Sequence, residues 1–361
     1  MLLLLMRGTR PLDLTLEIVP RARFDVVDLR ASLPASHVEA LAAYPRCLYC
    51  SFHTTAGFFD RSLVSRLAHQ RGVGAYVEAF RTIFPEGAGY EHDRLERRTE
   101  LSDAQRGVEP RNADSHLAFI ASGLRTCVSY PNRPGEPVFF VELDGENEGR
   151  RRRRLTRIVG YTNEREVATV RLQVPVSAHP VDSINLKDPR LGLYDQISDL
   201  IARAGVDKGR VRLSLHAGER HAGLAINEHE TLLMRHDLVE VLRDPLRFAI
   251  EKGRHALADP RAVPTKTLGY AQYDLVRVLN RLVDLLGLGE SRAERMLART
   301  MAYPLSRFFR MKRSVSLLVA TDGKTGAPAI VEGTYQSPIL IQWHRASRQA
   351  RVLDVTLFQL R

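Results

Sequence analysis

Cysteine is scarce in this chain, and long apolar runs are missing. Three cysteines in 361 residues cannot form a disulfide scaffold, so we expect a reducing, cytoplasmic compartment. Cys47 and Cys50 form one C-x-x-C pair, for which a buried strand is favoured over a redox motif, and no second pair completes a zinc site. No run of about 18 apolar residues occurs, so no transmembrane helix is expected. The apolar stretch 1–6 is too short for a signal peptide.

Acidic residues are fewer than basic ones, 42 against 53, which leaves a formal net charge of +11. A basic chain favours anionic partners, namely phosphorylated metabolites, nucleic acid or an acidic membrane surface, and the excess alone does not separate them. The hydrophobic content of 44% and the charged content of 26% are typical of globular proteins and argue against disorder. The length favours two domains.

Alternating apolar residues predict strands, and a period of about 3.6 residues predicts helices. Strands are expected at 12–19, 138–143, 155–161, 167–176, 211–215, 315–319, 339–343 and 352–358, and helices at 62–84, 194–204, 230–241, 270–286 and 291–309. The two kinds of element do not alternate regularly as they would in a doubly wound sheet. We therefore predict an α+β fold with mixed or antiparallel sheets.

The chain contains a spaced internal repeat. Segments 45–59 and 209–226 share one layout, an apolar strand, a polar turn and a second apolar stretch. Each half closes with paired strands joined by a basic loop, at 150–154 and at 345–351. Features in the same order indicate two copies of one fold, at 1–162 and 163–361, with low identity between them.

Three histidines lie at element ends in the first half, at His53, His92 and His116. Three imidazoles with a fourth position open to water are what a catalytic zinc site needs. Carboxylates such as Asp93 or Asp114 could orient the rings. The alternative is that these are ordinary surface or core histidines, and that residues 112–115 serve only as a helix N-cap.

The second half has a different polar set. Asn227 and Glu228 follow an apolar strand, and Asp237 lies nine residues after Glu228 on the next predicted helix. Counting back from that strand, Glu219 stands where the first half has His53. Each half therefore keeps a different part of a polar site, unless this set is only a solvated helix start with ordinary side-chain pairs.

These residues make the chain similar to the YjbQ family, also called secondary thiamine-phosphate synthases. The matching blocks of the first half are His53-Thr54-Thr55-Ala56, Tyr90-Glu91-His92-Asp93 and Asn112-Ala113-Asp114-Ser115-His116. Those of the second half are Asn227-Glu228, Arg235-His236-Asp237 and Gly333-Thr334-Tyr335-Gln336, followed by the terminal hairpin. The resemblance covers nearly the whole chain and implies two tandem family domains.

The chain departs from the family pattern in complementary ways. The first half has Arg61-Ser62 where the family has Asn-Glu, and it carries an insertion at about 94–111. The second half lacks the histidine blocks and has a predicted helical insertion at about 252–310. We therefore hypothesise one composite pocket with histidines from the first half and carboxylates from the second. Alternatively, the second copy is a scaffold.

The resemblance implies α/β sandwich domains that assemble as trimers and bind a divalent metal, with zinc expected and magnesium as the alternative. It assigns these side chains to three roles: metal ligands His53, His92 and His116; catalytic residues Glu228, Asp237 and His236; and substrate-binding residues Thr54, Thr55, Asn112, Ser115, Asn227 and Gln336.

The implied activity is a transferase reaction, the condensation of a pyrimidine diphosphate with a thiazole phosphate. Arginines at 150–154 could contact phosphates, because guanidinium matches phosphate geometry, although a solvated loop tip is the simpler interpretation. The alternative function is a non-catalytic, metal-dependent binding or scaffold protein. A nucleic acid is not an expected partner, since few aromatic residues accompany the arginines. A membrane partner is not expected either.

Overall fold

A computed structural model of the chain describes residues 10–67, 69–243, 248, 251, 311–323 and 325–361. The statements that follow concern these residues. The predicted helices at 270–286 and 291–309, and with them the predicted helical insertion at 252–310, lie outside the described residues.

The first half of the chain forms two main antiparallel sheets, of order β1-β9-β3-β5 and β2-β6-β4. Their strands are β1 (Leu12–Ile18), β2 (Asp25–Asp28), β3 (Arg46–Ser51), β4 (Ala56–Gly57), β5 (Cys127–Pro131), β6 (Phe139–Glu142) and β9 (Arg154–Tyr161). The short strands β7 (Glu146–Asn147) and β8 (Arg150–Arg151) pair as a hairpin. The helices are α1 (Leu29–Ser32), α2 (Ala35–Ala42), α3 (Arg61–Leu67), α4 (Gln70–Ile83), η1 (Leu95–Arg97), α5 (Asp103–Arg106) and α6 (Ala113–Ser122).

The second half also forms two antiparallel sheets, of order β10-β17-β12-β14-β15 and β11-β16-β13. Their strands are β10 (Glu164–Pro175), β11 (Asp182–Asn185), β12 (Lys208–Leu215), β13 (Ala222–Asn227), β14 (Ser314–Thr321), β15 (Pro328–Val331), β16 (Ser337–Gln342) and β17 (Ala350–Leu360). The helices are η2 (Pro189–Leu191), α7 (Leu193–Ala204), the π-helical turn η3 (Leu233–Asp237) and α8 (Leu238–Arg243). The α+β prediction with antiparallel sheets is confirmed.

The order of strands is the same in both halves. The sheet order β1-β9-β3-β5 corresponds strand for strand to β10-β17-β12-β14, and β2-β6-β4 corresponds to β11-β16-β13. Each half also contains a corresponding hydrogen bond at the start of the equivalent strand. The amide of Leu155 at the start of β9 donates to His53 Nε2 over 2.8 Å, and the amide of Val352 in β17 donates to Glu219 Oε1 over 2.8 Å. Glu219 therefore takes the structural place of His53.

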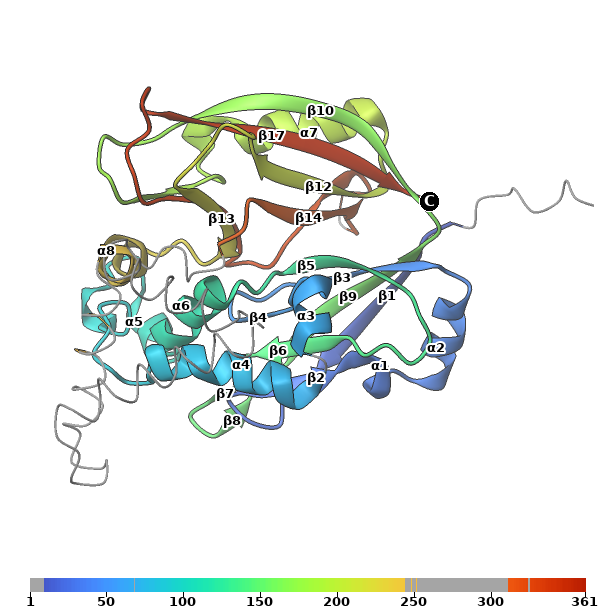
Figure 1. The fold of residues 1–361 in the computed structure, drawn as a ribbon, viewed down its shortest axis with the longest axis horizontal. Helices are drawn as coiled ribbons and strands as arrows, with labels where there is room; N and C mark the ends of the chain where they lie inside the picture. The colour runs from blue at the N-terminus through green and yellow to red at the C-terminus, as the bar shows by residue number, and fades with distance from the viewer. Residues whose placement is uncertain (1–9, 68, 244–247, 249–250, 252–310, 324) are drawn as a thin grey trace, which may run out of the picture.

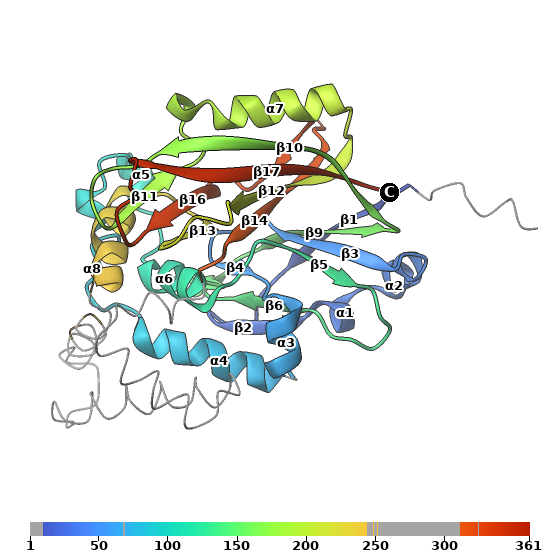
Figure 2. The ribbon, with the colours of Figure 1, turned by 45° about the horizontal axis from the view of Figure 1, so that its top comes forward.

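The two halves lie against each other as stacked layers (Figures 1 and 2). One apolar cluster joins α4 and α6 of the first half to β13, η3 and β16 of the second. Another joins β3, β5 and β9 to β14 and the end of β17. Burial of apolar surface on both sides of this boundary stabilises the contact between the halves. Consequently, side chains from each half can meet at one site.

The long helix predicted at 62–84 is interrupted, which corrects that prediction. Helix α3 ends at Leu67, and α4 begins at Gln70 with His69 as its N-cap, whose Nδ1 accepts the amide of Gly72 over 3.0 Å. A Cβ atom on Gly72 would stand 2.1 Å from the carbonyl oxygen of Leu67. The turn therefore requires glycine there, and the apolar periodicity across it hides the break.

The cysteines pack in the interior of the first half. Cys47 lies in the cluster under α1 and α2, whereas Cys50 and Cys127 lie together in the cluster facing the second half, with their sulfur atoms 3.4 Å apart. All three are free thiols, and burial raises the pKa of Cys47 to about 11. The C-x-x-C pair thus spans two faces of one buried strand, as the apolar context predicted.

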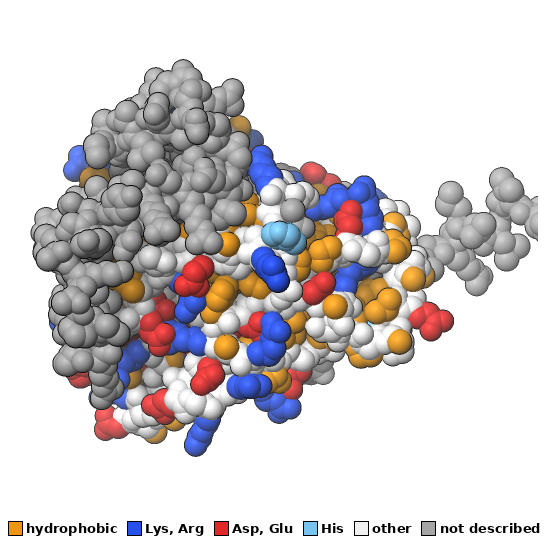
Figure 3. Space-filling view, turned by 60° about the horizontal axis from the view of Figure 1, so that its bottom comes forward, with side chains coloured by type: hydrophobic (Ala, Val, Ile, Leu, Met, Phe, Trp, Pro, Cys, Tyr) orange, Lys and Arg blue, Asp and Glu red, His pale blue; other side chains and the backbone are white. Residues whose placement is uncertain are grey.

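No helix among the described residues is long and apolar enough to cross a membrane. On the face of the molecule in Figure 3, basic and acidic side chains are interspersed, with hydrophobic side chains between them. The described part of that face therefore carries no continuous basic patch.

Candidate functional site

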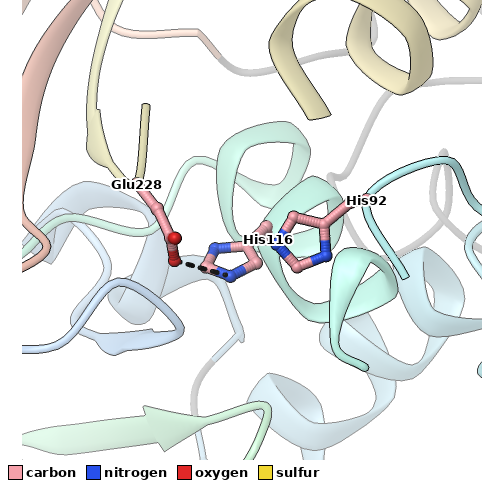
Figure 4. Close-up of side chains that lie close together, drawn as sticks. All are labelled: His92, His116 and Glu228. Atoms are coloured by element: carbon pink, nitrogen blue, oxygen red, sulfur yellow. Dashed lines mark ion pairs between the residues drawn. The ribbon is translucent and has the colours of Figure 1, made fainter. Parts of the chain in front are cut away.

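His92, His116 and Glu228 meet at the boundary between the two halves, and we call these three residues the composite cluster. One donor atom of each lies within 4.8 Å of the others. His92 follows α4, His116 lies on α6, and Glu228 directly follows β13. In Figure 4 the two imidazoles lie side by side and the carboxylate of Glu228 points at His116. Side chains of both halves therefore meet at this place.

Asn227 fixes which nitrogen of His116 carries the proton. The Asn227 Nδ2 donates to the carbonyl oxygen of Thr54 over 2.7 Å, so its Oδ1 must be an acceptor. That oxygen lies 2.8 Å from His116 Nδ1 and also accepts the amide of Glu228 over 2.9 Å. His116 Nδ1 is therefore the donor, and its Nε2 keeps a lone pair. This Nε2 lies 3.5 Å from Glu228 Oε2.

His92 is oriented in the same way by Asp93. His92 Nδ1 lies 3.0 Å from Asp93 Oδ1, and a carboxylate there can only accept. In the neutral ring, His92 Nε2 consequently presents a lone pair to the cluster. Asp93 Oδ1 also accepts the amide of Ala113 over 3.0 Å and so joins this loop to the start of α6. Asp93 thus has the orienting role predicted for a carboxylate. Asp114 instead pairs with Arg23 at 2.8 Å.

Asp237 holds the His92 loop from the second half. Its carboxylate accepts the backbone amides of Glu91 over 3.0 Å and His92 over 2.9 Å. Asp237 was predicted as an acid or base, but these bonds make it a residue that positions the loop. His236 is exposed on the same turn, η3, and does not belong to the composite cluster.

Arg98 enters the site from the segment at 94–111. Its guanidinium lies 3.3 Å from His92 Nε2 and 3.3 Å from Glu228 Oε1, and it pairs with Glu109 at 2.9 Å and Glu100 at 2.7 Å. Three carboxylates therefore surround the one guanidinium of Arg98 and more than balance its charge. The surroundings therefore attract further positive charge.

The cluster residues respond differently to burial. Burial lowers the pKa of His116 well below its usual value, with His92 as the next cause. Burial also opposes protonation of His92, but its hydrogen bond and charge pair with Asp93 outweigh this and raise the pKa. Burial raises the pKa of Glu228, although His92 and Arg98 act against it. His116 is thus held as a neutral imidazole.

A pocket of about 170 Å³ opens beside the composite cluster. It is lined by Phe52, His53, Thr54, Thr55, Glu109, Pro110, Asn112, Arg152, Arg154, Glu228 and Tyr335. Its lining includes two basic side chains, Arg152 and Arg154, and two acidic ones, Glu109 and Glu228. The exposed ring of Tyr335 stands at the rim. Such a pocket can hold a small anionic group near the cluster.

His53 lies in this pocket but not in the composite cluster, which differs from the predicted histidine triad. Its Nε2 lone pair is used by the amide of Leu155, and its Nδ1 lies 3.5 Å from the Arg154 guanidinium. Burial and then the nearby Arg154 and Arg152 lower the pKa of His53 to about 3. His53 is therefore neutral, with Nδ1 as its N–H. Glu228 supplies the third donor of the composite cluster in its place.

The arginines at 150–154 divide into different roles. Arg154 is buried and forms a double hydrogen bond with the buried Glu142, over 2.5 and 2.8 Å. Arg153 is exposed and pairs with Glu17. Arg152 lines the pocket, where it pairs with Asp144 at 3.1 Å and stays partly open to solvent. Only Arg152 of these three combines a place in the pocket with an accessible guanidinium.

The predicted substrate-binding residues also divide. Thr54, Thr55 and Asn112 line the pocket. The buried Oδ1 of Asn112 has no hydrogen-bond partner among the described residues, so it can accept a donor from a ligand. Ser115 is buried and donates to the carbonyl oxygen of Leu143 over 2.8 Å.

Gln336 and Asn227 join the two halves. Gln336 Nε2 donates to the carbonyl oxygens of Ser51 over 3.0 Å and His53 over 2.9 Å, and Asn227 binds Thr54 and His116. Both side chains use their amide groups on the first half. They hold the backbone of Ser51, His53 and Thr54 to the second half.

Sequence reasoning missed Arg98, Glu109 and Tyr335 as parts of this site. Arg98 and Glu109 lie in the segment that departs from the family pattern, so no motif pointed to them. The insertion between the two histidine blocks could have indicated them, because a segment inserted there must pass close to both blocks. Tyr335 was noted only as part of a motif.

No family model matches the chain, and no curated protein gives a significant match. Solved structures do. A YbjQ-like protein of unknown function from Sulfolobus solfataricus P2 is 14% identical, with a TM-score of 0.28, over 55% of this chain and 99% of that chain. A hypothetical protein from Aeropyrum pernix K1 is 15% identical, with a TM-score of 0.28, over 53% and 97%. An uncharacterized conserved protein of the YjbQ family from Clostridium acetobutylicum is 12% identical, with a TM-score of 0.26, over 52% and 98%.

Proposed function

We propose that this chain is a tandem YjbQ-like protein whose composite cluster binds a divalent cation, zinc in the first place and magnesium as the alternative. The observation that carries the proposal is the donor set of His92, His116 and Glu228. Two imidazoles and one carboxylate are a known catalytic zinc set, which leaves a position for water or substrate. Both imidazoles present Nε2, because Nδ1 of each is bonded to an oxygen acceptor. Such outer bonds raise ligand basicity and fix ring orientation.

The charge of the site supports the same proposal. The carboxylates of Glu100, Glu109 and Glu228 outnumber the single guanidinium of Arg98 by two. A divalent cation would balance them. It would take the His92 and Glu228 contacts that Arg98 makes in this structure, so Arg98 would turn towards Glu100 and Glu109 and the pocket.

The tandem arrangement belongs to this proposal. The identical strand order of the halves and the shared bond made by His53 and Glu219 support a duplication of one fold. In a duplicated fold each half can lose the groups that the other retains. Self-association of the trimer type, which the resemblance implies, is proposed with it and is measured by light scattering of the purified chain.

The proposed substrate is a phosphorylated small molecule, and the proposed reaction is transfer with loss of pyrophosphate, of the thiamine-phosphate synthase type. Arg152 would bind a phosphate, since its guanidinium lies in the pocket and Asp144 holds only part of it. His53 Nδ1–H would donate to a second phosphate oxygen. A bound zinc ion would act as a Lewis acid on the charge of the leaving pyrophosphate. Nucleic acid is not proposed as a partner.

The activity is tested by measuring pyrophosphate release from a pyrimidine diphosphate mixed with a thiazole phosphate, with and without zinc or magnesium. We expect release that depends on metal and falls at least tenfold in Arg152→Ala. Arg153→Ala, one residue away and outside the pocket, is the matched control and should keep the activity. Absence of release by the zinc-loaded chain would exclude the transferase.

A non-catalytic metal-dependent binding or scaffold protein is the second candidate. The small volume of the pocket, about 170 Å³, favours it, because typical ligand pockets are larger. Zinc binding without turnover of any phosphate ester in a screen would establish this alternative.

A further inference from the structure

A larger cavity lies in the second half, outside the site described above. Its volume is about 630 Å³, within the range of small-molecule sites. It lies between the strand β11 and the helical segment of η3 and α8, which are neighbours in Figure 2. The lining contains hydroxyls, basic groups and apolar side chains: Ser177, His179, Val181, Asp182, Ser183, Ile184, Asn185, Asp188, Arg190, His229, Thr231, Met234, Arg235, Val239 and Arg243.

The acidic residues of this cavity are already engaged. Asp182 accepts the backbone amides of Ser177 over 3.2 Å and Ser183 over 2.8 Å. Asp188 forms an ion pair with Arg190 at 2.5 Å and accepts its amide over 3.0 Å. Asp188 is thus paired with Arg190, whereas Asp182 keeps its negative charge and is held by the two amides.

Among the described residues, two of the remaining basic groups lack a carboxylate partner, and one imidazole nitrogen lacks a hydrogen-bond partner. Within the described part of the chain, Arg235 and Arg243 have no carboxylate partner, although both line the cavity. His229 Nε2 is buried and has no hydrogen-bond partner among the described residues. Two guanidinium groups and an imidazole nitrogen therefore line the cavity together with apolar side chains of the same helical segment, Met234 and Val239. Guanidinium groups bind phosphate and carboxylate oxygens in a bidentate way.

We propose that this cavity is a second ligand site, for a small organic oxyanion, either a phosphate monoester or a carboxylate, with an apolar body. Arg235 and Arg243 bind the anionic group, and the apolar wall takes the rest of the molecule. His229 donates or accepts at a polar substituent. The inference is independent of the proposed function, because no residue of the composite cluster lines the cavity.

The helix turn η3 separates the two sites. Met234 and Arg235 line the cavity, whereas Asp237, further along the same turn, holds the amides of the His92 loop. The exposed Arg235 can therefore be replaced without removing the contact that supports the composite cluster.

Isothermal titration of the full chain with phenyl phosphate, benzoate and inorganic phosphate tests the proposal. We expect phenyl phosphate or benzoate to bind, more tightly than inorganic phosphate, and the better of the two identifies the anionic group. The double variant Arg235→Ala/Arg243→Ala should bind it at least tenfold more weakly. The matched double variant Arg203→Ala/Arg220→Ala, with the same charge change at exposed positions of the second half, should bind like the parent.

Binding must also survive Arg152→Ala, which alters only the pocket beside the composite cluster. Loss of binding in Arg152→Ala with retention in Arg235→Ala/Arg243→Ala would assign the ligand to that other pocket and overturn the proposal. An equal loss in both double variants would show a general charge effect and overturn it too, as would absence of binding by the parent chain.

Discussion

His116 of the first half donates from Nδ1 to Oδ1 of Asn227 of the second half over 2.8 Å. Asn227 is fully buried, and its Nδ2 returns to the first half at the carbonyl oxygen of Thr54. One side chain of the second half therefore sets the tautomer of a first-half imidazole. The halves are interdependent at this point, because a residue of one half fixes the proton position of a histidine of the other.

Replacement of Asn227 by Ala should weaken zinc binding by about 10–100-fold, the usual cost of removing a residue that orients a ligand. It also leaves His116 Nδ1 and the Thr54 carbonyl without a partner, so the free energy of unfolding should fall by about 1–3 kcal/mol. Zinc titration and urea unfolding measure the two effects. The exposed Asn163→Ala is the control, and zinc affinity equal to the parent's in Asn227→Ala would contradict the assigned role.

Arg98→Ala should strengthen zinc binding, roughly tenfold, because the guanidinium at His92 Nε2 and Glu228 Oε1 competes with the ion. Without zinc, the same variant should be less stable than the parent, since the partly buried Glu109 and Glu228 lose their partner. Its unfolding midpoint should consequently rise more steeply with zinc concentration. Arg97→Ala, whose guanidinium is half-exposed and bonded to Glu91, serves as the control. A weaker zinc affinity in Arg98→Ala would show that Arg98 supports the ion rather than competing with it.

Stability should depend on pH through His53. Its pKa is about 3 in the folded chain, against about 6.5 when unfolded, so the unfolded state binds the extra proton between these values. The stability that neutral His53 contributes is present above pH 6.5 and is lost as pH falls from 6.5 towards 3. His53→Gln retains an acceptor for the Leu155 amide but does not titrate.

The comparison is made by urea unfolding at several pH values. Between pH 6 and 4 the parent should lose up to about 1.4 kcal/mol per pH unit more than His53→Gln. Parallel pH profiles for the two chains would mean that His53 titrates normally and is not held neutral by its surroundings.

The buried pair of Arg154 and Glu142 should matter far more than its exposed neighbour. Arg154→Met leaves an unpaired carboxylate inside the first half and should cost about 3–5 kcal/mol of stability. Arg153→Met breaks only the surface pair with Glu17 and should cost about 0–1 kcal/mol. Thermal and denaturant unfolding of both variants tests this. Similar losses of stability in Arg154→Met and Arg153→Met would contradict the different roles assigned to these two arginines.

Much of the fold was predictable because the alternation of buried and exposed side chains along a strand is a local pattern in the sequence. In β12 the inward side chains of Val211, Leu213 and Leu215 alternate with half-exposed ones, so the strand is visible in the sequence. The break before α4 was not, since it depends on the contact between Gly72 and the Leu67 carbonyl. Local pattern cannot report such a contact.

The types of residue in the candidate site were predictable from the sequence. Which of those residues come together in the structure was not. His92, His116 and Glu228 were all singled out from the sequence, whereas the exchange of His53 for Glu228 depends on how β13 docks against α6. Arg98 was hidden because it comes from a segment without a motif. Asp237 was predicted to be an acid or base, because the sequence does not show that the backbone amides of Glu91 and His92 donate to its carboxylate.

The most direct measurement is the zinc content of the purified, zinc-loaded chain by elemental analysis. It is compared with His92→Ala/His116→Ala and with His53→Ala, after each variant is shown to be folded by circular dichroism. We expect one zinc per chain in the parent and in His53→Ala, and none in the double variant. Loss of zinc in His53→Ala with retention in the double variant, or no zinc in the parent, would contradict the composite cluster as the metal site.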